Sequence, residues 1–494
     1  MGLYGGINIP GCPDLDNIRR LDLMPMESIA EMMRYGFPID RDHLRELSIK
    51  LGSEMTELRR EICDYIPAEK LDEFVGRSYA LEGNDRDDGD SEFAPMNVGS
   101  PAQMAKLLFD VLGIGKGKRL KMTKTGDRPS TGKRQLEQLK TDKSSHPVLK
   151  PVLAYSELAK LKSTYTDSLP NQARRHQRGD CRVCERRHEH ETFNIHTTLL
   201  STRTSTGRFA SKQPNLQNIP VRSEYGRQTR SAFIAPPGMV LVSCDFSQLQ
   251  LRILADRARE EKLIWIFANN KDPHTMTAMG AFGLANESDV DPLTQRAPAK
   301  NVNFAVAFGE TPQGLFDQLV ADSYGKSGLE VPEWLTMAWC EEFFEKWHGL
   351  YPAVRPYMEK QFYRARRYGI VWDMFGRIRR VPEVRSVHPK VVAAGLRQAG
   401  NHPIQAPDSA IMRLSMAEVQ TEVIEKVRLE GIWAYPVMTV HDELIVAVDE
   451  EYGDVMCARL EQVMGNVMLD RETGEQKLAV PIVAKGHVMK RWEK

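Results

Sequence analysis

The segment VLVSCDFSQLQLRILA, residues 240–255, constrains the fold most, because it places one carboxylate between an apolar strand and a helix. Residues 239–242 are a continuous apolar run and predict a buried strand. The apolar positions within 249–254 predict a packed helix that starts near Ser247. Asp245 lies at the junction, where it suits Mg²⁺, an ion usually held by one or two carboxylates with phosphate oxygens and water. Asp is also a favoured helix N-cap, and this segment alone supports both interpretations equally.

The chain has 494 residues, too many for one compact core, and this length predicts two to four units. Lys and Arg number 67, as do Asp and Glu, so the net charge does not indicate a polyanion partner, although a balanced total can hide a basic cleft. The seven cysteines are scattered, and neither a secretory signal nor an apolar run of membrane-spanning length is present. We therefore expect a soluble, cytoplasmic protein with no membrane partner.

A second acid occurs in VMTVHDELIVAV, residues 437–448. Two apolar, β-rich runs flank His441, Asp442 and Glu443, which predicts a hairpin with the acids at its tight turn. Charged residues are common at hairpin tips, but Asp442 lies between runs apolar enough for a buried sheet, just as Asp245 ends one. Two acids on adjacent strand ends could hold two metal ions for an in-line phosphoryl or nucleotidyl displacement.

The segment RAPAKNVNFAVAFG, residues 296–309, predicts a helix that starts near its first residue, because Pro298 is tolerated only in a first helical turn. Two cations and then two aromatic residues recur at a spacing of four, namely Arg296, Lys300, Phe304 and Phe308. Cations at a helix N-terminus could hold a polyphosphate, and the aromatic end could stack on a base. An ordinary amphipathic helix explains the same spacing and is the favoured interpretation for this helix taken alone.

Two further polar segments suit nucleic-acid binding and solvent exposure equally well. The loop 204–220 is rich in Gly, Ser, Asn and Pro, and its candidate ligands are Arg208, Asn215 and Gln217. Farther along the chain a polar stripe recurs at four-residue spacing on an expected helix, and it consists of Arg397, Asn401 and Gln405. Such side chains could contact sugars, phosphates or the edge of a duplex, or they could simply face water.

The segment QARRHQRGDCRVCERRHEHE, residues 172–191, contains Cys181, Cys184, His188 and His190, which could in principle coordinate zinc. The spacing to His188 is short, and no second, distant pair of ligands is present. A charged surface insertion is therefore the favoured interpretation, with zinc at Cys181 and Cys184 as the alternative.

Taken together, the ordered motifs resemble those of family A (DNA polymerase I-like) DNA polymerases, over nearly the whole range 22–492. The three polymerase motifs of that family correspond to DFSQLQLR from Asp245, RAPAKNVNFAVAFG from Arg296, and VHDE ending at Glu443. TGRFASKQPNLQNIP, from Thr206, matches a further family signature. The resemblance implies an α+β, right-hand polymerase fold with an antiparallel sheet in the palm and helical fingers and thumb.

The resemblance also implies an order of domains along the chain. Five regions are expected: an N-terminal helical region leading into the thumb (1–94), the thumb with a basic loop and the Cys/His insertion (95–193), the first part of the palm with the first acid (194–258), the fingers with the nucleotide-binding helix 296–309 (259–395), and the second part of the palm with the second acid (396–494). The basic loop is Lys116–Lys124, KGKRLKMTK.

The matched motifs imply a role for each of their residues. Asp245, Asp442 and the Phe246 main-chain carbonyl would hold two Mg²⁺ ions, for which Mn²⁺ can substitute, while Glu443 would support the site. Lys300 would also donate a proton to pyrophosphate. The side chains implied to bind the incoming dNTP are Arg296, Lys300, Phe304, Phe308 and Gln250. Those implied to contact primer–template DNA are Arg208, Asn215, Gln217, Arg397, Asn401, Gln405 and His441.

The implied activity is that of a DNA-directed DNA polymerase, a nucleotidyltransferase of DNA replication and repair. Because the resemblance starts near the N-terminus, we expect neither a proofreading exonuclease nor a 5′ nuclease in this chain. It would be a naturally short enzyme, for example of phage type and then in the host cytoplasm, or a fragment or subunit that works with a separate exonuclease, helicase or processivity factor. The alternatives are a catalytically inactive nucleic-acid-binding scaffold and, less favoured, a single-subunit RNA polymerase.

Three positions depart from the usual family pattern. DNA-specific members usually have Glu where Gln250 stands, a residue that crowds the sugar 2′ position, and many have Tyr where Phe308 stands. The carboxylate–phenol bond between such residues cannot form here, so we expect ribonucleotide exclusion to persist through size alone and to be weaker. Phe304 in place of Tyr predicts poor use of dideoxynucleotides.

Overall fold

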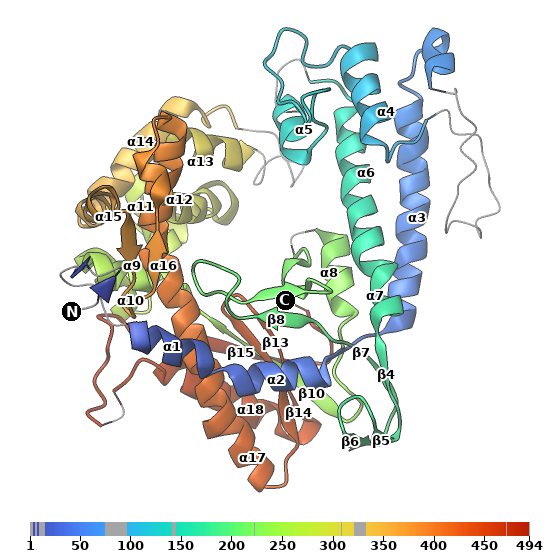
Figure 1. Cartoon of the computed structure of the whole chain (residues 1–494). Coiled ribbons are helices and arrows are strands. Elements are labelled where there is room, and N and C mark those ends of the chain that lie inside the picture. The colour runs from blue at the N-terminus through green and yellow to red at the C-terminus, as the bar shows by residue number, and fades with distance from the viewer. Residues whose placement is uncertain are drawn as a thin grey trace. The chain divides into compact units, whose positions relative to one another are not determined.

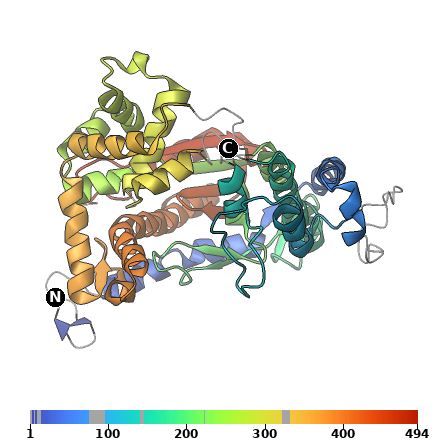
Figure 2. The same cartoon turned by 90° about the horizontal axis from the view of Figure 1, so that it is seen from above.

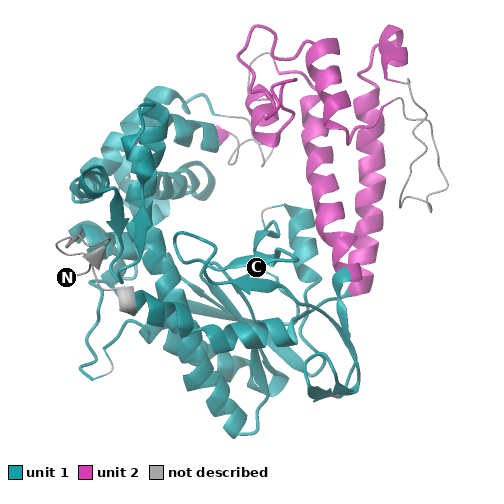
Figure 3. Cartoon of the chain, in the orientation of Figure 1, with its two compact units in different colours: residues 1–40, 172–319, 332–494 teal, residues 41–171, 320–331 magenta. Residues whose placement is uncertain are grey.

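The computed structural model describes residues 3–4, 7–8, 15–74, 96–140, 145–221, 223–307, 309–320, 332–470 and 472–493. The chain divides into two compact units (Figure 3). Unit 1 comprises residues 1–40, 172–319 and 332–494, and unit 2 comprises residues 41–171 and 320–331. No helix in the described ranges is both long enough and apolar enough to cross a membrane.

Unit 2 is helical. Its two long helices, α3 (Arg41–Cys63) and α6 (Leu149–Leu161), pack against each other. Its shorter helices are η1 (Ala68–Glu73), α4 (Pro101–Ala105), η2 (Lys106–Val111), α5 (Lys133–Lys140), η3 (Lys162–Thr166) and most of α7 (Ser168–Gln172). Apolar side chains from several of these helices, such as Leu107 and Val152, are buried in one core. The basic side chains of the loop 116–124 are exposed.

The centre of unit 1 is a four-stranded antiparallel sheet in the order β13-β14-β10-β15 (Figure 1). Its strands are β10 (Met239–Phe246), β13 (Ala434–Val440), β14 (Glu443–Asp449) and β15 (Ala484–Met489). Nearly every residue of β10, β13 and β14 is buried, as their continuous apolar runs predict. α18 (Gly453–Asn466) packs on β10 and β15, and α2 (Met26–Tyr35) packs on β13. The predicted strand, the predicted hairpin and the α+β class are confirmed.

The junction after β10 differs in detail from the prediction. α9 (Leu249–Ala258) begins two residues later than expected, because Gln248 adopts a left-handed conformation with φ +54° and occupies the N-cap position. Asp245 is still within β10, three residues before that cap. The interpretation of Asp245 as a helix cap is therefore wrong, and its carboxylate has another role.

The helix expected to start near Arg296 begins earlier. η6 (Pro292–Arg296) is a wide, π-helical turn that continues directly into α12 (Ala297–Ala307), and the carboxylate of Asp291 caps it. The N–H groups at the end of this turn bond five residues back, and Pro298, which has no N–H, follows where α-helical geometry resumes. Arg296 thus lies a full turn inside the helix, and its predicted place at a helix N-terminus is wrong.

The other helices of unit 1 frame the sheet and its loops. α16 (Pro389–Val419), the helix predicted to carry the polar stripe, lies beside α1 (Leu15–Leu23) and α2 in both views (Figures 1 and 2). The remaining helices are α8 (Glu224–Ser231), α10 (Glu261–Ala268), α11 (Pro273–Phe282), η5 (Glu287–Asp289), α13 (Pro312–Gln318), α14 (Met337–Leu350), α15 (Val354–Tyr368), η8 (Pro382–Arg385), η9 (Gln420–Ile424), α17 (Glu425–Leu429) and η10 (Glu450–Tyr452), with η4 (Leu216–Asn218) in the loop 204–220.

Small sheets complete unit 1. The insertion 172–191 forms β4 (Arg174–His176) and a hairpin of β5 (Gly179–Cys181) and β6 (Arg186–His188). β4 joins β7 (Thr192–Ile195) and β3 (Phe37–Pro38) in a three-stranded sheet. The other strands are β1 (Leu3–Tyr4), β2 (Ile7–Asn8), β8 (Thr198–Leu200), β9 (Ala210–Lys212), β11 (Ile370–Trp372) and β12 (Ile378–Arg380).

Candidate active site

The two acids predicted to bind metal lie at the same end of the central sheet. Asp245, near the end of β10, is the register partner of Glu443 at the start of β14. Asp442 is the second residue of the two-residue turn between β13 and β14, and His441, the first, has φ +57°, as tight hairpin turns require at that position. The N–H of Phe246 donates to the carbonyl oxygen of Asp442 over 3.2 Å. This hydrogen bond joins the backbones of the two acidic motifs.

The surroundings of Asp442 favour a bound cation. Burial raises its pKa, and the negative charges of Asp245 and Asp408 raise it further, to about 7. The carboxylate of Glu443 has its own hydrogen-bond donor, because the Ser243 hydroxyl donates to it inside the sheet. Carboxylates crowded in this way are the donors that a hard cation such as Mg²⁺ prefers, so the residues fit the metal that the sequence predicts.

A third acid, Asp408 on α16, was missed by the sequence analysis. Its side chain is 3% exposed, and its Oδ2 accepts hydrogen bonds from Gln250 Nε2 at 2.8 Å and from Arg208 Nη2 at 2.5 Å. Two side chains predicted to bind substrate and DNA therefore meet on one buried carboxylate. The only signal in the sequence was an acid just before the apolar run AIM in a helix, a place where a charge is buried only if it is paired.

The helix that carries Arg296 is linked to the first acidic motif through Asp272, which precedes α11. Asp272 Oδ2 accepts from Arg296 Nε at 2.8 Å, and its Oδ1 accepts from Gln248 Nε2 at 3.1 Å. Burial alone would raise the pKa of Asp272, but the hydrogen bonds from Arg296 and Thr275 outweigh burial and hold it well below its usual range. The carboxylate is therefore ionised and fixes the direction of the guanidinium.

His274, on α11, is a buried neighbour of this helix that was also missed. Trp347 Nε1 donates to Asn303 Oδ1 at 2.7 Å, so the Asn303 amide nitrogen faces His274 Nδ1, at 2.9 Å. His274 therefore accepts at Nδ1 and carries its proton on Nε2. Burial, with the nearby positive charges of Lys300 and Arg296, lowers its pKa to about 4 against the opposing effect of a carboxylate, and keeps the ring neutral. Its ring centroid lies 5.7 Å from that of Phe304.

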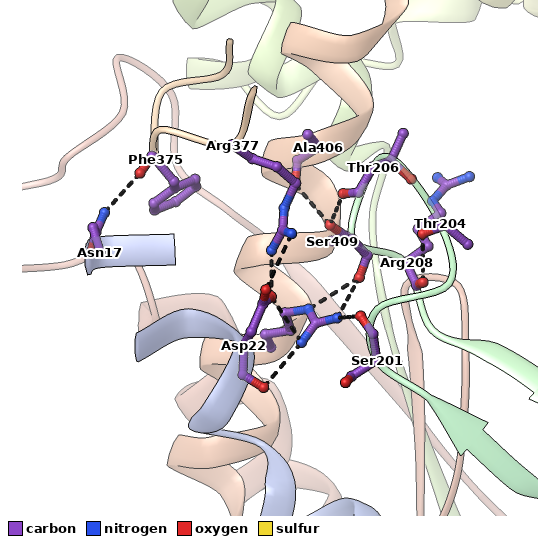
Figure 4. Close-up of polar contacts among 12 residues, drawn as sticks. Asn17, Asp22, Ser201, Thr204, Thr206, Arg208, Phe375, Arg377, Ala406 and Ser409 are labelled. Carbon is purple, nitrogen blue, oxygen red and sulfur yellow. Dashed lines mark hydrogen bonds and ion pairs between the residues drawn. The ribbon is translucent and has the colours of Figure 1, made fainter. Parts of the chain in front are cut away.

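The loop that carries Arg208 is anchored on α16 (Figure 4). Arg413 is fully buried, donates to the Gly207 carbonyl at 2.7 Å and pairs with Asp22 at 3.2 Å. The Ser409 hydroxyl donates to another carbonyl of the same loop at 2.5 Å. The position of Arg208 thus depends on α16 twice, through these anchors and through its own ion pair.

The side chain of Gln217 holds the loop 204–220 in place. Its Oε1 accepts from the Ser211 N–H at 3.1 Å, and its Nε2 donates to the Thr439 carbonyl at 3.0 Å. The amide thereby ties the loop 204–220 to β13, the strand that leads to the His441–Asp442 turn. Asn215, two residues earlier, is exposed and lies just before η4.

The remaining predicted residues are placed as follows. Arg397, Asn401 and Gln405 are half-buried on α16, one helical turn apart, upstream of Asp408. Lys300 and His441 are exposed, and Phe304 is half-buried. Phe308 lies outside the described residues, as does the side chain of His188.

Comparison with known proteins identifies the family of the chain. The model of the family described as DNA polymerase family A matches residues 81–494. DNA polymerase I, thermostable, of Thermus aquaticus is 34% identical over 467 residues, which are 94% of this chain and 46% of that protein. DNA polymerase I of Pseudomonas aeruginosa is 32% identical over 473 residues, or 96% of this chain and 43% of that protein. The chain therefore spans less than half the length of these relatives.

A solved structure agrees with this assignment. It is the POL domain of Pol1 from M. smegmatis in complex with DNA primer-template and dNTP, and it is similar over 97% of this chain and 72% of that one, with 26% sequence identity and a TM-score of 0.73. The match of the family model to most of the chain and the acidic motifs joined at one end of the sheet lead to the same conclusion: the chain belongs to DNA polymerase family A.

Proposed function

We propose that this chain is a template-directed DNA polymerase that adds deoxynucleotides to a primer 3′ end by nucleotidyl transfer. The observation that carries the proposal is the joining of the Asp245 and Asp442 motifs at one sheet end, with Gln248 and Asp272 connecting that end to Arg296. The solved relative, bound to DNA primer-template and dNTP, supports the same two ligands for this chain.

Asp245 and Asp442, together with the main-chain carbonyl of Phe246, would hold two Mg²⁺ ions, for which Mn²⁺ can substitute. When bound, such ions activate the primer 3′-hydroxyl and neutralise charge on the pyrophosphate leaving group. The protein's own contribution is to hold the two carboxylates rigidly through strand pairing. Glu443, which accepts from Ser243, stabilises the strand ends that carry them.

Arg296 and Lys300 would bind the triphosphate of the incoming nucleotide. Asp272 holds Arg296 through Nε, so the Nη groups on the other side of the guanidinium can donate to phosphate oxygens. His274, neutral and protonated on Nε2, can donate a further hydrogen bond without adding charge. Lys300 would give a proton to the pyrophosphate, and Phe304 would pack against the nucleoside.

Gln250 would face the sugar of the incoming nucleotide and exclude the 2′-hydroxyl. Asp408 accepts a hydrogen bond from its amide and so holds the side chain in one orientation. This contact supplies a polar partner that the hypothesis of exclusion by size alone did not include. Exclusion of ribonucleotides is therefore expected to depend on Asp408 as well as on the size of Gln250.

The primer–template would be bound by polar groups of the loop 204–220, α16 and the catalytic turn. These groups are Arg208, Asn215, Arg397, Asn401, Gln405 and His441. Gln217 would act indirectly, because its amide holds the loop to β13. Unit 2, which shares residues 95–171 with the implied thumb (95–193), would serve as the main part of the thumb, and its exposed basic loop would contact the phosphate backbone.

Primer extension on a short primer–template with Mg²⁺ and dNTPs tests the proposal. We expect templated extension by the wild type and a loss of at least about a thousandfold in Asp245→Asn and Asp442→Asn, because metal-ion charge stabilisation is worth several kcal/mol. Asp454→Asn, an exposed carboxylate on α18, is the matched control and should be unaffected. DNA binding with no extension by the wild type would instead support an inactive scaffold.

A further inference from the structure

A second cluster of metal-binding groups lies in unit 1, in the insertion 172–191. One ligand atom each from His176, Cys181 and Cys184 lies within 4.8 Å of the others, and all three residues are buried. His176 ends β4, Cys181 ends β5, and Cys184 lies in the turn between β5 and β6. The charged side chains of this segment are mostly exposed, as a charged surface insertion predicts, but Cys181 and Cys184 are buried.

The turn between β5 and β6 brings the two cysteines close together. Glu185 adopts φ +58°, which turns the chain sharply after the second cysteine. The thiolate is the form of cysteine that binds metals, so binding of a metal ion here would release the thiol protons.

A chain of hydrogen bonds sets the tautomer of His176. His196 Nδ1 lies 2.9 Å from the Met33 carbonyl, to which it must donate, so the Nε2 of neutral His196 is an acceptor. His176 Nε2 lies 3.0 Å from that atom and must donate to it. The lone pair of His176 is then on Nδ1. Metal-binding histidines commonly use the other ring nitrogen in such a hydrogen bond, which fixes the ring and raises its basicity.

We propose that His176, Cys181 and Cys184 bind one zinc ion. Two thiolates and an imidazole are the donors that zinc takes in structural sites, whereas magnesium prefers oxygen. Among the described residues no fourth side chain joins the cluster. A water molecule, or His190, which lines the same cavity as His176, would complete a tetrahedral ion.

The ion would stabilise the contacts of the β5–β6 hairpin with α2 and with the start of β13. Arg34 of α2 donates to the Cys184 carbonyl at 2.8 Å, and Arg186 donates to the Tyr35 hydroxyl at 2.8 Å. The guanidinium of Arg186 also lies 3.4 Å from the ring centroid of Trp433, the residue just before β13. Zinc would thus lock the β5–β6 hairpin onto α2 and onto the start of the strand that ends at the His441–Asp442 turn.

Zinc uptake by the whole chain tests this proposal. The protein is purified under reducing conditions, stripped of metal and titrated with Zn²⁺ alone in competition with a chromophoric chelator. We expect one tight site per chain, weakened by more than about 100-fold in Cys181→Ser and Cys184→Ser, because changes behind a ligand alone lower metal affinity by about 10–100-fold. Cys457→Ser, a half-buried cysteine on α18, is the matched control and should bind zinc as the wild type does.

Two further measurements separate this site from the catalytic carboxylates and from misfolding. The double variant Asp245→Asn, Asp442→Asn should keep the tight zinc site. Wild-type protein loaded with Co²⁺ should show a thiolate-to-cobalt charge-transfer band that is lost in Cys184→Ser. Absence of this band in the wild type would overturn the proposal even if a cysteine variant failed to fold, and so would equal zinc affinity in the wild type and both cysteine variants.

Discussion

Replacement of Asp408 by Ala is expected to weaken discrimination against ribonucleotides. In the wild type, Asp408 Oδ2 accepts from Gln250 Nε2 at 2.8 Å, and the carboxylate is almost completely buried. Without this acceptor the Gln250 amide has no fixed partner on α16 and can rotate away from the position where a 2′-hydroxyl would enter. The change leaves the size of Gln250 intact, so it separates exclusion by orientation from exclusion by size.

The size of the expected loss of discrimination follows from the type of hydrogen bond between Gln250 and Asp408. A hydrogen bond to a charged group contributes about 1.5–3 kcal/mol, and since Gln250 is only half-buried the lower figure applies. About 1.4 kcal/mol corresponds to a tenfold change in relative rate, so the ratio of kcat/KM for dCTP over CTP should fall about tenfold. Asp408 also pairs with Arg208, but the loss of that contact affects both nucleotides and largely cancels in the ratio.

Single-nucleotide incorporation of dCTP and CTP opposite the same template base measures this ratio. Asp408→Asn keeps an acceptor for the Gln250 amide and should stay within about threefold of the wild type, since most of the geometry is retained. In a Gln250→Ala background, Asp408→Ala should have no further effect on the ratio, because residues that act through one contact are not additive. A ratio unchanged in Asp408→Ala but lowered in Gln250→Ala would refute the role of Asp408.

Three other outcomes are expected. Arg413→Met should lower the free energy of unfolding in urea by about 2–4 kcal/mol, because the carbonyls of Ser201 and Gly207 lose their donor and each buried carbonyl left unpaired costs about 1–3 kcal/mol. Asp22 keeps its ion pair with Arg377, and a change below about 1 kcal/mol would contradict the prediction. Burial lowers the pKa of His402 to about 4, so the unfolded chain binds more protons between pH 6.5 and 4, and stability should fall through that window by up to about 3 kcal/mol. Urea unfolding of His402→Gln at pH 5 and 7.5 should show a smaller pH dependence, and an unchanged one would exclude His402 as the source. Phe304→Tyr should improve dideoxynucleotide termination in a sequencing-type extension assay, and equal termination by both proteins would count against the family analogy.

The parts of the site that could be predicted are those encoded by local patterns. A continuous run of apolar residues predicts β10, and the helical spacing of the apolar residues after it predicts α9. Two β-rich runs on either side of His441 and Asp442 predict the β13–β14 hairpin. The acids at these positions follow from the same short segments. The residues proposed to bind zinc also lie close together in the sequence, but His176 precedes the Cys-x-x-Cys pair and was not among the candidate ligands predicted from the sequence.

The start of the helix that contains Arg296 was predicted wrongly from the local sequence. A proline normally marks a first turn, and that rule placed the start at Arg296. The chain instead forms a π-helical turn from Pro292, capped by Asp291, and this wider turn accommodates Pro298 inside the helix. The four-residue spacing of Arg296, Lys300 and Phe304 is the same whether the helix starts at Arg296 or at Pro292. It therefore predicts neither the π-helical turn nor the cap that precedes it.

Asp408 could not be predicted because its importance arises from contacts between segments far apart in the chain. Gln250 and Arg208 are 158 and 200 residues away from it, and each belongs to a separate element. The same carboxylate raises the pKa of Asp442, so it contacts or influences the proposed sugar-facing residue, the proposed DNA-binding loop and the proposed metal ligands at once. If these proposed roles hold, one substitution of Asp408 should change several properties, and measuring nucleotide choice, DNA affinity and metal affinity in one Asp408 variant would show whether the three are coupled.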